Sequence, residues 1–194
     1  MIKFIGVYDY TVILTYLSLI SSIFGMTQAI HGDYKDAIFC LAFSGICDAF
    51  DGRVARTKKN RTEDEKNFGI QLDSLVDVIS FGLFPASLCY LMGVNCKFGV
   101  ALCMLYCICA VCRLAYFNVL ESNRQKTEGG SNKYYRGLPV TSIAIIFPLV
   151  YLISQILPET LSRAILYLML GIVGFLFILD FSVKKPDLKK LLRL

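Results

Sequence analysis

The chain has 194 residues, of which 56% are hydrophobic and 18% are charged. Its mean hydropathy of +0.59 excludes an ordinary soluble domain of this length. The formal net charge is +5, but in a membrane protein the distribution of Lys and Arg among the loops carries more information than this total.

Six segments are predicted to be membrane-spanning helices, because about 20 mainly apolar residues are enough to cross a bilayer. They are residues 12–30, 36–55, 70–92, 98–119, 138–157 and 161–183. We expect one membrane domain over 1–194. Residues 1–10 alternate apolar and polar groups, which favours a short N-terminal interfacial helix. The first apolar segment lacks a small-residue cleavage pattern, so it is not expected to be a removed signal peptide.

Lys and Arg are concentrated in three segments, 53–66, 124–136 and 184–193. With six spans, all three segments and both termini fall on the same side of the membrane, and the positive-inside rule makes that side cytoplasmic. We therefore expect a multi-pass protein of the cell membrane with cytoplasmic termini and an exposed polar loop over 121–133. No nucleic-acid partner is expected.

Eight cysteines are present, and only Cys96 lies near a predicted loop. A buried cysteine behaves as a small hydrophobic residue, and no second pair of ligands completes a zinc pattern. We interpret the cysteines as packing residues.

Four aspartates interrupt the second and third apolar segments. They are Asp48, Asp51, Asp73 and Asp77. An unpaired carboxylate at the membrane centre costs roughly 2.5 to 3.5 kcal/mol of insertion free energy, so the four aspartates need a partner that neutralises their charge. Spacings of three and four residues place each pair on one helical face, and antiparallel packing of the two helices would bring all four into one pocket near the cytoplasmic surface.

Oxygen ligands without nearby His or Cys favour hard divalent cations. We expect two such ions, Mg²⁺ or Mn²⁺, with Ca²⁺ as a further possibility. A pair of divalent ions clamps phosphate oxygens during an in-line displacement. The carboxylates therefore predict a phosphate ester or a pyrophosphate as substrate.

The neighbours of the aspartates are small or basic. Gly52 and Ala55 leave room for a ligand beside the first pair, and Arg56 is placed to hydrogen-bond a phosphate. Gly69 precedes Asp73 by four residues and opens the same face of the next helix.

The run Asp48-Ala-Phe-Asp-Gly-Arg-Val-Ala-Arg56, followed by Gly69-x3-Asp73-x3-Asp77, resembles the complete signature of the CDP-alcohol phosphotransferase family. The resemblance implies an all-α integral membrane fold of six helices, usually a homodimer, with a cytoplasm-facing cavity that opens sideways to membrane lipids. It also implies that Gly52, Ala55 and Arg56 bind the CDP portion of the substrate.

The same likeness implies a role for each aspartate. Asp48 and Asp73 would contact both metals, Asp51 would complete one ion and Asp77 the other. Asp77 would also be the catalytic base that takes the proton of the acceptor hydroxyl. From the chemistry of the residues alone, which aspartate is the base stays open, because a metal-bound carboxylate is a weak base.

Three further stretches resemble the phosphatidylserine synthase branch of this family: 68–86, 113–118 and 137–139. This resemblance implies transfer of a phosphatidyl or archaetidyl group from a CDP-lipid to L-serine, with release of CMP. Arg113 and Arg136 are candidates to bind the serine carboxylate. Tyr116 stands where we expect Arg in that branch, and Asp9-Tyr10 where we expect Pro-Asn.

Other functions stay open at this point. Glycerol 3-phosphate, inositol or inositol phosphate could be the acceptor within the same family. A divalent-cation transporter would need acidic groups along the whole membrane path, and an intramembrane prenyltransferase would be expected to carry its aspartates on more widely separated helices of a larger bundle.

Overall fold

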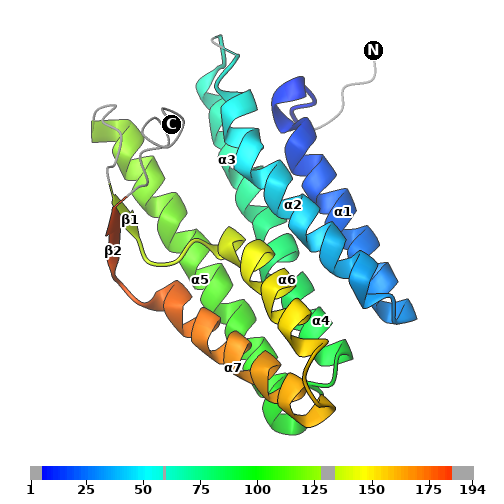
Figure 1. Cartoon of the computed structure of the whole chain (residues 1–194). Helices are drawn as coiled ribbons and strands as arrows, with labels where there is room; N and C mark the ends of the chain where they lie inside the picture. The colour runs from blue at the N-terminus through cyan, green and yellow to red at the C-terminus, as the bar shows by residue number, and fades with distance from the viewer. Residues whose placement is uncertain (1–5, 59, 128–133, 185–194) are drawn as a thin grey trace, which may run out of the picture.

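The computed structural model describes residues 6–58, 60–127 and 134–184, with side chains described over 6–58, 60–120 and 137–181. Long helices account for most of this part of the chain (Figure 1). In chain order the elements are η1 (Tyr10–Val12), α1 (Ile13–His31), α2 (Tyr34–Ala55), α3 (Glu63–Asp77), η2 (Val78–Leu83), α4 (Phe84–Leu91), α5 (Lys97–Thr127), β1 (Tyr134–Arg136), η3 (Val140–Ser142), α6 (Ile143–Ser154), α7 (Glu159–Ile178) and β2 (Ser182–Lys184).

Helices α1 and α2 form an antiparallel hairpin. Gly32 ends α1 with φ of +88°, and the N–H groups of Gly32 and Asp33 bond back to carbonyls of the last turn. Glycine is favoured here because other residues rarely adopt a positive φ. The tight turn lets the two helices pack along their length (Figure 1).

Helix α3 continues through η2 into α4, so one long helix covers Glu63–Leu91. It begins with a capping box, in which the Thr62 hydroxyl accepts from the Glu65 N–H at 3.2 Å and the Glu65 carboxylate accepts from the Thr62 N–H at 3.0 Å. Segment η2 is a π-helix that starts directly after Asp77. Such wide turns are rare in proteins overall, and those that occur often lie at functional sites.

A cluster of buried serines joins α1, α2 and the π-helical segment. The Ser22 hydroxyl lies 2.9 Å from that of Ser44 and donates to that of Ser80 at 2.7 Å, while Ser44 donates to the Ser18 carbonyl at 3.0 Å. Small hydroxyl residues let helices approach closely and bond to one another in an apolar environment. This cluster fixes three helices just beyond the aspartates.

The other half of the bundle is made of α5, α6 and α7. Helices α5 and α7 lie side by side (Figure 1). Strand β1, which precedes η3 and α6, pairs antiparallel with β2, which follows α7. The turns between α1 and α2, α4 and α5, and α6 and α7 lie at one end of the bundle. The α2–α3 connection and the β1–β2 ribbon lie at the other end (Figure 1).

Four helices of the described chain are long and apolar enough to cross a membrane, namely Tyr10–His31, Glu63–Leu91, Lys97–Leu120 and Glu159–Ile178. Large apolar side chains are exposed on them, such as Ile20 at 61% and Phe98 at 69%, which fits a surface in contact with lipid. These features indicate a membrane protein. These four helices have the length and apolar composition that a span requires. Six spans stay a prediction, which also includes α2, with its aspartates, and the shorter apolar helix Val140–Ser154.

Several predicted boundaries were wrong. The helix at 70–92 begins at Glu63, because the capping box starts it early. The helix at 161–183 ends at Ile178, where the backbone becomes extended and leads into β2. Residues 121–127, predicted as loop, continue α5 as helix, while 128–133 lie outside the described residues.

Two other predictions concern the fold class. The predicted all-α class is confirmed for the described chain, since helices form nearly all of its regular structure, and the prediction missed only the short β1–β2 ribbon. The predicted interfacial helix at 1–10 is absent over the part that the structure describes, because residues 6–9 are not helical and Tyr10 already begins η1. Residues 1–5 lie outside that part.

Candidate functional site

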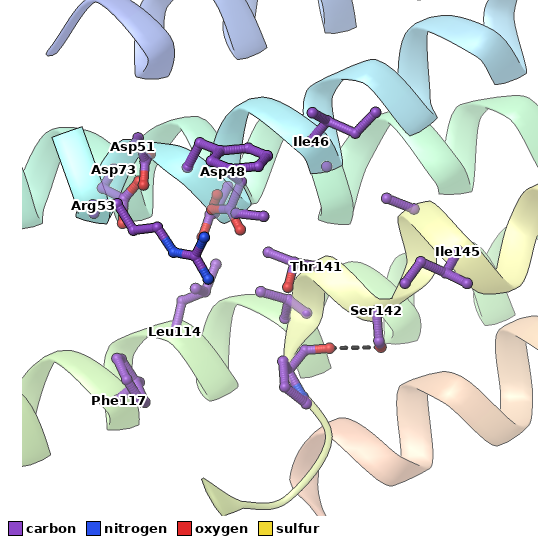
Figure 2. A pocket seen from close by; sticks show the side chains of 18 of the residues that line it. Ile46, Asp48, Asp51, Arg53, Asp73, Leu114, Phe117, Thr141, Ser142 and Ile145 are labelled. Atoms are coloured by element: carbon purple, nitrogen blue, oxygen red, sulfur yellow. Dashed lines mark hydrogen bonds between the residues drawn. The ribbon is translucent and has the colours of Figure 1, made fainter. Parts of the chain in front are cut away.

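The four aspartates lie on two neighbouring helices, in the second half of α2 and in the stretch of the Glu63–Leu91 helix from its first half to its midpoint. Asp48 and Asp51 belong to the last two turns of α2, while Asp73 and Asp77 belong to the last two turns of α3. Because each pair is separated by three or four residues, each presents its carboxylates on one face of its helix. Figure 2 shows Asp48, Asp51 and Asp73 close together at one wall of a cavity.

Three of the carboxylates can share one ion. Asp48, Asp73 and Asp77 each offer an oxygen, and these oxygens lie within 4.8 Å of one another. Asp77 is only 7% exposed. Like charges so close together in a buried place repel one another unless a cation compensates them, so this cluster has the donor set and the spacing of a site for a divalent cation.

Asp51 lies beside this group and is 8% exposed. Its Oδ2 accepts a hydrogen bond of 3.4 Å from the hydroxyl of Thr15 on α1. The bond comes from a residue 36 positions away in the chain. Asp51 is therefore oriented by α1 as well as by its own helix.

The aspartates line a cavity of about 900 Å³ between α2, α3, α5 and the start of α6. Three arginines of the described chain also line it, namely Arg53, Arg56 and Arg113. Figure 2 shows Arg53 extending over the cavity. The Arg53 guanidinium carbon lies 5.5 Å from the ring centre of Phe50. The arrangement suits a ligand that combines phosphate groups with a divalent cation.

The remaining wall of this cavity is apolar. Its large apolar side chains include Ile46, Phe50, Leu114, Phe117 and Ile145 (Figure 2). A cavity with acidic, basic and apolar walls can hold a ligand that has a charged head and an apolar tail.

A smaller cavity of about 120 Å³ adjoins the first and shares Asp51, Gly52 and Asp73 with it. Ala55 and Gly69 also line it. A Cβ on Gly69 would lie 2.7 Å from the terminal nitrogen of Arg61, so the missing side chain makes room for that guanidinium. Small residues thus keep the helices open beside the aspartates.

The structure assembles the predicted residues in part. Gly52, Arg56 and Arg113 line the large cavity with all four aspartates, whereas Ala55 and Gly69 line only the smaller one. Arg136 belongs to β1 by its backbone, and its side chain lies outside the described part.

Sequence reasoning missed four residues of the site: Thr15, Arg53, Arg61 and Thr141. Arg53 lies inside the recognised motif and Arg61 in the basic cluster, so both could have been proposed from position alone. Thr15 and Thr141 approach the site only through helix packing, and no local pattern indicates them.

An ion-pair network ties the start of the chain to the α2–α3 connection. Lys58 Nζ lies 2.7 Å from Asp9 Oδ2 and 3.1 Å from Glu65 Oε1. The Lys58 ammonium and the hydroxyl and N–H of Thr11 lower the pKa of Asp9 to about 2, and the two carboxylates raise the pKa of Lys58. This network holds the connection between the two aspartate-bearing helices.

Comparisons with known proteins agree with this geometry. A family model described as CDP-alcohol phosphatidyltransferase matches residues 10–178. The CDP-diacylglycerol–serine O-phosphatidyltransferase of Saccharomyces cerevisiae is 34% identical over 144 residues, which are 72% of this chain and 50% of that protein. The archaetidylserine synthase of Methanothermobacter thermautotrophicus is 34% identical over 141 residues, which are 72% of this chain and 56% of that protein.

A CDP-diacylglycerol–serine O-phosphatidyltransferase from Helicobacter pylori is 33% identical over 178 residues, which are 88% of this chain and 70% of that protein. The chain spans about half the length of the first two relatives. No solved structure matches the chain.

Proposed function

Because the chain belongs to the CDP-alcohol phosphatidyltransferase family, we propose that it transfers a phosphatidyl or archaetidyl group from a CDP-activated lipid to the hydroxyl of L-serine and releases CMP. The observation that carries this proposal is the convergence of Asp48, Asp73 and Asp77 beside a cavity with basic and apolar walls. The choice of serine rests on the relatives, which are named for serine.

The carboxylates would hold two divalent cations, Mg²⁺ or Mn²⁺, since the donor set is made of hard oxygen ligands. The ligands would be Asp48, Asp51, Asp73 and Asp77. Bound there, the ions would stabilise the charge that develops on the phosphate oxygens.

The chain's own residues would position the substrates and move one proton. Asp77 would accept the proton of the acceptor hydroxyl while the hydroxyl oxygen bonds to the phosphorus that carries the lipid. The bond from that phosphorus to the CMP oxygen would break, and CMP would leave. Arg56 would balance phosphate charge, Gly52 would give the nucleotide room between the helices, and Gly69 would make room for the Arg61 guanidinium beside it.

The protein would span the membrane six times, with α2 and α6 completing the four apolar helices. The basic α2–α3 connection directly follows the half of α2 that carries Asp48 and Asp51, which supports a site nearer the cytoplasmic side. The apolar wall would receive the lipid tails. By family likeness the protein would form a homodimer.

Three of the aspartates form one compact cluster rather than a series along a membrane path, which supports an enzyme over a cation transporter. The test is CMP release by the purified chain from CDP-diacylglycerol, with L-serine, glycerol 3-phosphate, inositol or inositol phosphate as acceptor. We expect release with L-serine only, and its loss when EDTA is added. Release with another acceptor but not with serine would assign the chain to a sister activity, and release that persists in EDTA would contradict metal catalysis.

A further inference from the structure

We propose that a further cavity, which we call the second cavity and which is distinct from the cavity of about 120 Å³ beside Gly69, binds an α-amino acid as a zwitterion. Arg113 would bind its carboxylate and Asp180 its ammonium group. This inference rests on the proposed function, because it assigns the binding site of the serine acceptor. It adds a carboxylate that the sequence motifs do not include.

The second cavity lies between α5 and the end of α7 and has a volume of about 370 Å³. Its lining includes Arg113, Tyr116, Gly137 and Asp180. Arg113 also lines the large cavity, and it is the residue common to the described linings of the two. It therefore stands at the boundary between the second cavity and the aspartates.

The position of Arg113 is determined by its surroundings. The residue is 8% exposed, and its Nε donates to the Leu138 carbonyl at 3.2 Å. Gly137 packs against it with φ of +68°, and a Cβ there would lie 3.0 Å from the Leu179 carbonyl and 3.6 Å from the Arg113 guanidinium carbon. Only glycine combines this backbone conformation with so little space.

The segment that supports Arg113 is itself anchored to the end of α7. The Gly137 N–H donates to the Phe181 carbonyl at 2.7 Å, and the Leu138 N–H donates to the Leu176 carbonyl at 3.3 Å. The same stretch of chain carries Asp180, one residue before Phe181. Arg113 and Asp180 are therefore both connected to the segment 137–138 by hydrogen bonds of that segment, which limits how far the two opposite charges can move relative to one another.

A zwitterion matches this pair of charges. An α-amino acid carries a carboxylate and an ammonium group on one carbon, and a guanidinium binds a carboxylate with two parallel hydrogen bonds. A phosphorylated alcohol has two negative charges and no cation, so the Asp180 carboxylate would repel it. Asp180 thus provides selection for an amino acid over the phosphorylated acceptors of related enzymes.

The location also suits the reaction. An amino acid whose carboxylate lies on Arg113 is at the border of the cavity that Asp77 lines. Its side-chain hydroxyl can then point to the aspartates while its ammonium group stays in the second cavity. Recognition of the amino acid would then take place in the second cavity, and activation of its hydroxyl at the aspartates.

The test compares the full-length wild-type protein with Asp180→Asn, using CMP release from CDP-diacylglycerol. The two probes are L-serine and 3-hydroxypropionate, which keeps the hydroxyl and the carboxylate but has no ammonium group. The second probe is measured as a substrate or as a competitive inhibitor of serine. Asp33→Asn is the matched control, because Asp33 is an exposed aspartate at the opposite end of the bundle.

We expect Asp180→Asn to raise the KM for L-serine about tenfold, the worth of one charge-assisted hydrogen bond, and to change kcat little. The KM or inhibition constant of Asp180→Asn for 3-hydroxypropionate should stay within about twofold of the wild-type value. In Asp33→Asn, the KM and kcat for L-serine and the constant for 3-hydroxypropionate should also stay within about twofold of wild type. An unchanged KM for serine, or an equal loss for both probes, would overturn the assignment of Asp180. Wild-type protein that releases no CMP with serine would instead refute the proposed function, and this inference with it.

Discussion

The Tyr106 hydroxyl donates a hydrogen bond of 2.8 Å to the carbonyl oxygen of Phe81. Phe81 lies in the π-helical segment that directly follows Asp77, and Tyr106 comes from the first third of α5. A wide turn leaves a helical carbonyl without its usual donor, and in an apolar interior that carbonyl needs a partner. Tyr106 supplies it, so packing against α5 stabilises the turn that sets the direction of α3 and its aspartates.

Replacing Tyr106 by Phe should destabilise the protein by about 1 kcal/mol, since it removes the donor and leaves a buried carbonyl unpaired. Thermal unfolding in detergent measures the effect. Tyr90→Phe is the control, because Tyr90 is exposed. Equal unfolding midpoints for the two variants would show that the bond contributes nothing.

A second prediction concerns the close approach of α2 and α6. A Cβ on Gly45 would lie 2.4 Å from the Cβ of Ala144, whereas a Cβ on Gly171 would have its nearest neighbour at 4.0 Å. Gly45→Ala should therefore destabilise the protein by roughly 1 to 3 kcal/mol through overpacking. Gly171→Ala should be neutral or stabilising, because alanine is the better helix former. Unfolding curves that move in the same direction for both would contradict this explanation.

A third prediction concerns Asp77. Asp77→Asn removes both a metal ligand and the proposed base while keeping the shape of the side chain. We expect CMP release to fall roughly 100- to 10,000-fold, and binding of Mn²⁺, followed by its paramagnetic resonance signal, to weaken. Asp36→Asn, at the far end of α2, should keep wild-type values. Near wild-type turnover in the Asp77 variant would exclude the proposed role.

The ion pair at the start of the chain predicts a dependence on pH. The folded-state pKa of Asp9 is lowered from 3.8 to about 2, chiefly by Lys58. A depressed pKa stabilises the folded state at pH values above the unfolded pKa, and this contribution is lost as the pH falls toward the folded pKa. Wild type should therefore be more stable than Asp9→Asn at pH 5, and the difference should disappear between about pH 4 and pH 2. Unfolding midpoints over this range measure it, and a difference that is constant with pH would contradict the role of Asp9.

Local patterns in the sequence were sufficient to predict the main helices and the aspartate cluster. The spacings of Asp48, Asp51, Asp73 and Asp77 place each pair on one face whatever the rest of the fold does, and the short connection brings the two helices together. The structure indeed brings oxygens of three of these residues within 4.8 Å of one another. The helix ends were less predictable, because capping and the β1–β2 ribbon determine them.

The sequence by itself determined that the chain is apolar, helical and supplied with paired carboxylates, since composition and helical periodicity are properties of neighbouring residues. Only the tertiary structure decided where the wide turn after Asp77 lies, that Thr15 orients Asp51, and that Arg113 and Asp180 line one cavity. Each of these depends on contacts between residues far apart in the chain. Such contacts follow from how whole helices pack against one another, which no short stretch of sequence records.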